Sequence, residues 1–180
     1  MVVPDAPAKF LVACGKEAKI YVLDRRNLGQ YSPPTTTPCH DNVVDSRNLY
    51  QDLLGREGKS DFSGVFGGPA YYEGGAEKRI YYCSRPWQMG PPVPLGAWAI
   101  DSSGKLNLVD RSSDTFSSGA IPVVSSNGDA DGIVWLVDVS VAMLYAYDAM
   151  NLSRRLVRVN AGAWNTTDFP PYPVPTIRCM

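Results

Sequence analysis

Leu144-Tyr-Ala-Tyr-Asp148-Ala-Met-Asn151 is an apolar run that ends in an aspartate and is followed, three residues after that aspartate, by an asparagine. The pattern occurs twice more, with Asn or Gly at the last position, as Ile20-Tyr-Val-Leu-Asp24-Arg-Arg-Asn27 and Ala97-Trp-Ala-Ile-Asp101-Ser-Ser-Gly104. At the first position of a type I turn an aspartate accepts hydrogen bonds from the turn's own N–H groups, and Gly or Asn at the last position adopts positive φ easily. A strand and turn that recur with a long period predict a β-propeller or another repeat architecture.

A second recurring signal is a proline that opens a short apolar stretch. Pro69, Pro122 and Pro175 do this at two equal intervals of 53 residues. Proline lacks the N–H that a central strand donates, so it is tolerated at the first residue of a strand or on an edge. The aspartates are less evenly spaced, at intervals of 77 and 47 residues, and we place the surplus chain between Ser32 and Phe62.

These two signals predict consecutive four-stranded units of about 50 residues, which is the size of a propeller blade. For the third unit we expect strands at residues 121–126, 133–138, 143–147 and 156–159. For the second unit we expect strands at 69–72, 79–83, 96–100 and 106–109. In the first unit, residues 10–14 and 20–23 are expected to be the second and third strands around a turn at 15–18, and Val2-Val3-Pro4 the tail of the first strand.

We therefore predict an all-β fold, a partial β-propeller of consecutive four-stranded antiparallel blades. The predicted divisions are an incomplete first blade at 1–32, a loop insertion at 33–62, a second blade at 63–112, a third blade at 113–162, and a linker with the start of the next blade at 163–180. A closed propeller has about four to eight blades, so we expect the chain to be part of a larger propeller. The one helical pattern is weak and covers 45–54, with Ser46 as a candidate cap.

Composition and charge favour a β-rich protein and give no support to several other classes. Aromatic residues make up 11% of the chain, and 16 Gly and 15 Pro suit short strands joined by many turns. The net charge of −1 gives no reason to expect nucleic acid or an anionic membrane as a partner. No stretch is long and apolar enough to span a bilayer, and the first residues show no signal-peptide pattern.

The cysteines and the single histidine do not form a recognisable site. The four cysteines contain no C-x-x-C pair, which argues against a zinc site or a redox motif, and we interpret them as free thiols. They are Cys14, Cys39, Cys83 and Cys179. His40 adjoins Cys39, but sequence neighbours on an extended loop point apart, so we interpret His40 as a solvated loop residue and not as a catalytic base.

Two further groups of residues have a structural and a functional interpretation. Asn127, Asp129 and Asp131 before Gly132 partly resemble the start of a calcium loop, but position 12 falls on Asp138 within a predicted strand, and a hairpin turn fits better. The tryptophans could stack a flat cofactor or a sugar, although two of them lie in predicted strands and are interpreted as packing residues. The tryptophans are Trp87, Trp98, Trp135 and Trp164.

Several segments of the chain, taken in order, resemble pyrroloquinoline-quinone (PQQ)-like β-propeller repeat proteins of the quinoprotein alcohol dehydrogenase-like superfamily. The segments are Leu11–Gly29, Val65–Tyr71, Val123–Gly128, Gly132–Trp135 and Leu144–Leu152. The resemblance implies a propeller fold and an extracellular or periplasmic location. It implies little about activity, because most such repeat proteins have no established one.

The chain departs from the pattern of the quinone-dependent enzymes. Those enzymes carry an Ala-x-Asp-x-x-Thr-Gly motif followed by a tryptophan. Ala99-Ile-Asp101 and Ala146-Tyr-Asp148 keep the first part of this motif, whereas in the first unit Val22 replaces the alanine. No tryptophan follows on the predicted fourth strands, and the adjacent cysteine pair of the alcohol-oxidising members is missing. Their calcium ligands and catalytic aspartate cannot be placed on this chain, so no catalytic, cofactor-binding or metal residue is assigned.

Two functions remain as hypotheses. The first is a non-catalytic β-propeller scaffold or binding module within a larger propeller protein, whose partners are the adjoining blades. The alternative is a PQQ-dependent dehydrogenase that acts on an alcohol or a sugar, with PQQ and calcium as cofactors under this alternative alone. The repeat pattern without a catalytic constellation favours the first.

Overall fold

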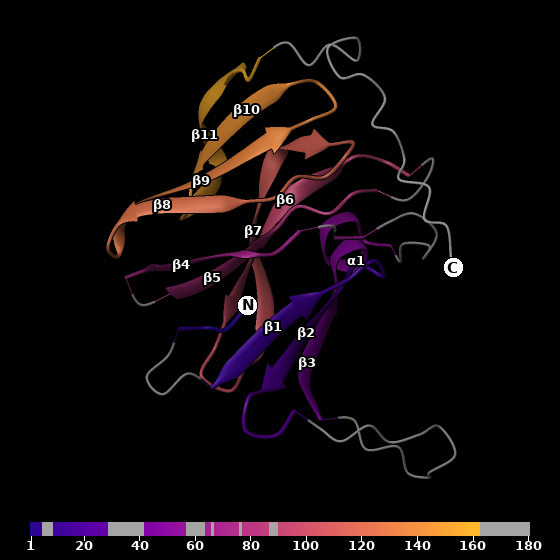
Figure 1. Ribbon diagram of the computed structural model, residues 1–180, viewed down its shortest axis with the longest axis vertical. Coiled ribbons are helices and arrows are strands. Elements are labelled where there is room, and N and C mark those ends of the chain that lie inside the picture. Colours follow the sequence, from indigo (N-terminus) through magenta and orange to yellow (C-terminus); the bar gives the residue numbers. More distant parts are fainter. Residues whose placement is uncertain are drawn as a thin grey trace, which may run out of the picture.

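The structure is a computed structural model that describes residues 1–4, 9–28, 42–56, 64–65, 67–75, 77–86 and 90–162. Among these residues eleven strands form three antiparallel sheets, accompanied by one short helix (Figure 1). The predicted all-β class is confirmed, and the sheets of three or four strands in meandering order form a blade-like arrangement.

The first sheet contains β1 (Phe10–Cys14), β2 (Lys19–Asp24) and β3 (Val43–Asn48), hydrogen-bonded in that order. Val2 forms an antiparallel bridge with Leu11, and the Val3 N–H donates to the Phe10 carbonyl over 3.0 Å. Residues 1–3 therefore occupy the place of a first strand beside β1, as the sequence predicted for this segment.

The range predicted as a loop insertion, 33–62, contains both β3 and the helix α1 (Leu49–Leu54). The first sheet therefore extends beyond residue 32, and Ser46 is a strand residue and not the helix cap. Asn48 is the cap, because its side chain accepts hydrogen bonds from the Tyr50 and Gln51 N–H groups. The helical pattern predicted at 45–54 is confirmed for residues 49–54, where burial of one face stabilises so short a helix. The strand β3 was missed because it lacks strict apolar alternation and is held by its pairing with β2.

The second and third sheets are complete four-stranded meanders. The second contains β4 (Ala70–Gly74), β5 (Glu77–Tyr82), β6 (Val93–Ile100) and β7 (Leu106–Phe116). The third contains β8 (Val123–Asn127), β9 (Ala130–Asp138), β10 (Met143–Asp148) and β11 (Asn151–Asn160). Pro69 and Pro122 directly precede β4 and β8, the first strands of these sheets, as expected for a residue without an N–H.

The three aspartates of the recurring pattern lie in turns between the third and fourth strands. In each turn the carboxylate accepts a backbone N–H two residues later: Asp24 from Arg26, Asp101 from Ser103 and Asp148 from Met150. The predicted role of these aspartates as turn-forming residues is confirmed. The expected positive φ occurs at Gly104, at +87°, whereas the two asparagines at the equivalent positions do not adopt it.

Two apolar cores separate the three sheets. One lies between the first and second sheets and includes Val12, Val22, Ile80 and Trp98, together with the buried face of α1. The other lies between the second and third sheets and contains Tyr81, Leu95, Val134, Leu136 and Tyr147, among others. The sheets thus stack face to face in chain order, and each core is shared by two consecutive sheets (Figure 1).

Candidate interaction surface

Two aspartates make the same contact at the two junctions between sheets. Asp45 in β3 accepts the Leu106 N–H at the start of β7 over 2.7 Å, and Asp110 in β7 accepts the Leu152 N–H near the start of β11 over 2.6 Å. In both cases the other carboxylate oxygen accepts the N–H of the residue that follows the aspartate. We call Asp45 and Asp110 the junction aspartates, because each joins the fourth strand of one sheet to the fourth strand of the next.

The junction aspartates were missed in the sequence because their function depends on two sheets being docked. The shared signal is a Val-Asp dipeptide, at 44–45 and at 109–110. The same dipeptide also occurs at 137–138, where Asp138 accepts the Ser140 N–H in a turn instead. The dipeptide therefore could not have identified the contact without the strand pairing.

The third sheet has a valine where the first two have a junction aspartate. Asp45 lies opposite Val22 and Asp110 lies opposite Ala97, each on the neighbouring third strand of its sheet. Val22 stands two residues before its turn aspartate and Ala97 four, and the β11 residues opposite the matching positions of β10, Ala146 and Leu144, are Val157 and Val159. No junction carboxylate therefore projects from either position of the third sheet.

One face of the third sheet is directed away from the second sheet and is almost entirely apolar. Side chains alternate along a strand, and the buried residues Val134, Leu136, Tyr145 and Tyr147 face the second sheet. Their neighbours face the opposite way and, with Val123 of β8, form the outer face of the third sheet. These residues are Val123, Ile133, Trp135, Val137, Leu144, Ala146, Val157 and Val159.

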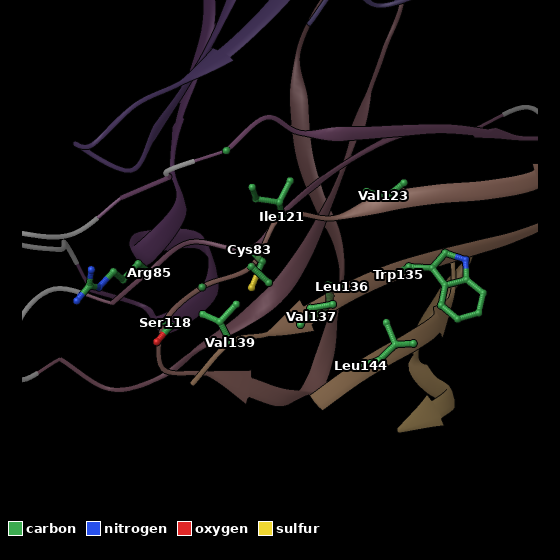
Figure 2. A pocket seen from close by; sticks show the side chains of 13 residues that line it. Cys83, Arg85, Ser118, Ile121, Val123, Trp135, Leu136, Val137, Val139 and Leu144 are labelled. Atoms are coloured by element: carbon green, nitrogen blue, oxygen red, sulfur yellow. The ribbon is translucent and has the colours of Figure 1, made fainter. Parts of the chain in front are cut away.

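A hollow of about 390 Å³ opens at one end of this outer face (Figure 2). Its lining is mainly aliphatic and aromatic: Ile121, Val123, Trp135, Val137, Val139 and Leu144 contribute most of the labelled side chains, and Ser118 and Arg85 are among the few polar ones. The indole N–H of Trp135 is satisfied by the Ser125 hydroxyl over 2.8 Å. The hollow therefore suits an apolar segment better than a charged ligand.

Cys83 lines the hollow but is not an activated nucleophile. Its side chain is buried, and this burial raises the pKa of the thiol well above its ordinary value. Burial also raises the pKa of Cys14, to about 12. Both cysteines are free, as predicted, and both remain protonated at neutral pH, where the thiolate is the reactive form.

The structure resolves the alternative interpretations for some of the other candidate residues. Asn127 pairs with Ala130 across a tight hairpin between β8 and β9, so the predicted hairpin turn is confirmed. Trp98 is fully buried in the first core, and its indole N–H donates to Asp52 over 2.8 Å, which confirms a packing role. Cys39, His40, Trp87, Trp164 and Cys179 lie outside the described residues.

Calcium would be needed under the dehydrogenase alternative, and its preferred ligands are oxygen atoms. Within the described ranges no group of three or more His, Cys, Asp and Glu side chains could hold a metal ion. The lining of the hollow includes no carboxylate, although calcium prefers carboxylate and carbonyl oxygens. We therefore derive no chemical step through calcium or a quinone.

No protein-family model matches this chain, and no curated protein or solved structure is significantly similar to it. In the part of the chain that the structure describes, there is no helix of the length and apolarity needed to cross a membrane.

Proposed function

We propose that this chain is a non-catalytic β-propeller scaffold or binding module that forms part of a larger propeller. The observation that carries the proposal is the repeated junction, in which Asp45 and Asp110 make equivalent contacts to the next sheet. Two sheet junctions with the same polar contact indicate a repeating structural unit, as in proteins whose stability comes from contacts between neighbouring repeats.

The arrangement of the first strands supports the same proposal. β4 and β8, which open the second and third sheets, contact each other, as do the last strands β7 and β11. Sheets that meet through both their first and last strands pack over their whole width. In a propeller the first strands of successive blades surround the central channel, and we assign β4 and β8 to that position.

The chemistry of the described carboxylates also favours a structural role. Asp24, Asp101 and Asp148 are occupied by turn N–H groups, and the two junction aspartates by N–H groups of neighbouring strands. A general base must lie within reach of a substrate proton, and these five carboxylates lie in turns and at sheet junctions and do not line the hollow.

A turnover assay tests this proposal against the dehydrogenase alternative. The purified chain is incubated with PQQ and Ca²⁺, and reduction of an artificial electron-accepting dye is followed with a panel of primary alcohols and aldoses. A quinone-dependent alcohol dehydrogenase serves as the positive control, and the chain unfolded by heat as the negative one. We expect no dye reduction above the negative control, whereas saturable reduction that requires substrate, quinone and folded chain would overturn the proposal.

A further inference from the structure

The hollow at the end of the third sheet gathers the most exposed apolar side chains of the described residues. Val123 and Val139 are 60% exposed and Ile121 is 59% exposed, more than any other large apolar side chain in the described part of the chain. All three line the hollow (Figure 2). Exposed apolar side chains that gather around one concavity mark a binding site, whereas scattered single ones need no explanation.

One wall of the hollow is held in place by close packing. Residues 118–121 form this wall, where Gly119 has a φ of +67° and a Cβ on it would lie 2.7 Å from the backbone nitrogen of Arg85. On the other side of the same segment, a Cβ on Gly67 would lie 2.4 Å from Cγ1 of Ile121. Because the segment is packed tightly on both sides, this wall is pre-formed, as is usual in small-molecule sites.

A second wall comes from the two central strands of the third sheet. Trp135 of β9 and Leu144 of β10 line it. The Ser125 hydroxyl already accepts the indole N–H, so the indole offers carbon surface to a ligand. The polar side chains Arg85 and Ser118 lie on the side away from Trp135 (Figure 2). The hollow is therefore apolar through most of its extent and polar at one side, which fits a largely apolar ligand.

Backbone pairing favours a small molecule over an apolar peptide as the occupant. β9 pairs with β8 on one side and with β10 on the other, and β10 also pairs with β11, so the backbone of this wall offers a peptide few free partners. A peptide in the hollow would bury its own N–H and C=O groups unpaired, which is costly. A molecule with few polar groups avoids this cost. The volume of about 390 Å³ also lies in the range of small-molecule sites, about 300–1,000 Å³.

We propose that the hollow binds an uncharged, largely apolar small molecule with an aromatic or alicyclic body, which packs against Trp135. Among the described residues no carboxylate lines the hollow to balance a cationic ligand, and an anionic group would lose its hydration among aliphatic side chains. The proposal rests on the binding-module function proposed above and deepens it by naming the class of ligand.

A fluorescence titration of the 180-residue chain with N-phenyl-1-naphthylamine, an uncharged aromatic probe that brightens in apolar surroundings, tests the proposal. Val123→Glu places a carboxylate in the hollow, and the matched control Val141→Glu changes a side chain that is 55% exposed and does not line it. We expect saturable binding of one probe per chain, weakened by about 10-fold or more in Val123→Glu and unchanged in Val141→Glu. No saturable binding by the native chain, or equal affinities in the two variants, would overturn the proposal.

Methyl NMR of the native chain locates the probe without any substitution. The probe should shift the methyl resonances of Ile121, Val123 and Leu144, which line the hollow. It should leave those of Val12 and Val22, in the first core, unchanged. Unshifted methyl groups in the hollow, or equal shifts in the first core, would overturn the proposal. Such a result would leave the scaffold function standing, because the dye-reduction assay tests it separately.

Discussion

Replacing Asp110 by alanine should detach the start of β11 from the second sheet without unfolding the first junction. In the native chain the Asp110 carboxylate accepts the Leu152 N–H over 2.6 Å, and Leu152 is fully buried. The alanine variant leaves this N–H without its acceptor in an apolar environment. The second core and the β10–β11 pairing remain, so the damage should be local.

The expected cost is about 2 kcal/mol. A buried donor that loses its partner costs about 1–3 kcal/mol, and a hydrogen bond to a charged acceptor contributes about 1.5–3 kcal/mol. The carboxylate is 21% exposed, so solvent screens it only in part. The loss of Arg79 as a partner of Asp110 adds little, because the two groups are 3.8 Å apart and Arg79 also donates to the Ala149 carbonyl.

Native-state hydrogen exchange measures this cost at the site. Local opening that is easier by about 2 kcal/mol should speed exchange of the Leu152 amide roughly 30-fold. Asp110→Asn keeps one acceptor oxygen and should change the free energy of local opening about half as much. Asp129→Ala, at an exposed aspartate in the β8–β9 turn, is the control and should change it very little. Unchanged protection of Leu152 in Asp110→Ala would refute the junction role, and equal loss of protection in the first sheet would refute its locality.

Three further outcomes follow from local features of the fold. The hydrogen bonds that the Arg26 side chain and N–H donate hold the pKa of Asp24 at about 2, below its ordinary 3.8, so this stabilisation is complete above about pH 4 and is lost as the pH falls towards 2. A carboxyl ¹³C titration should give this value, and one near 3.8 would contradict it. Gly104→Ala should destabilise the chain by about 1–3 kcal/mol more than Gly128→Ala. Both glycines have positive φ, but only at Gly104 would a Cβ come within 2.8 Å of side chains of the first sheet. Equal losses of unfolding free energy in the two variants, measured by urea unfolding, would argue against this packing. Cys83 should resist iodoacetamide at pH 8 until denaturant is added, as judged by peptide mass spectrometry; alkylation in the native chain would show that it is accessible.

The parts of the fold that depend only on residues close together in the sequence were predictable. Each aspartate turn is closed by its own backbone, and each proline acts only on the strand that it opens, so Asp101 and Pro122 could be assigned without knowledge of packing. The predicted second, third and fourth strands of the two later sheets also appear. The fourth strands are much longer than predicted, because β7 continues to Phe116 and β11 begins at Asn151.

The parts that depend on contacts between distant residues were not predictable. β3 is separated from its partner β2 by residues 25–42, and its sequence lacks the alternation that marks a strand with one buried face. The junction aspartates bind N–H groups 61 and 42 residues away. The outer face of the third sheet looks in sequence like any buried strand face, and only the stacking order shows that it is directed away from the second sheet.

A crystal structure of the 180-residue chain tests the central claim, the propeller-like stack of sheets, most directly. The account predicts that the three sheets are related by successive rotations of the same sense about one axis, by about 45–90° each for a propeller of eight to four blades. Residues 1–3, β4 and β8 should lie nearest that axis, and both junction aspartates should be bonded to the next sheet. Rotations of opposite sense at the two junctions, or sheets that stack with no common rotation axis, would contradict the account.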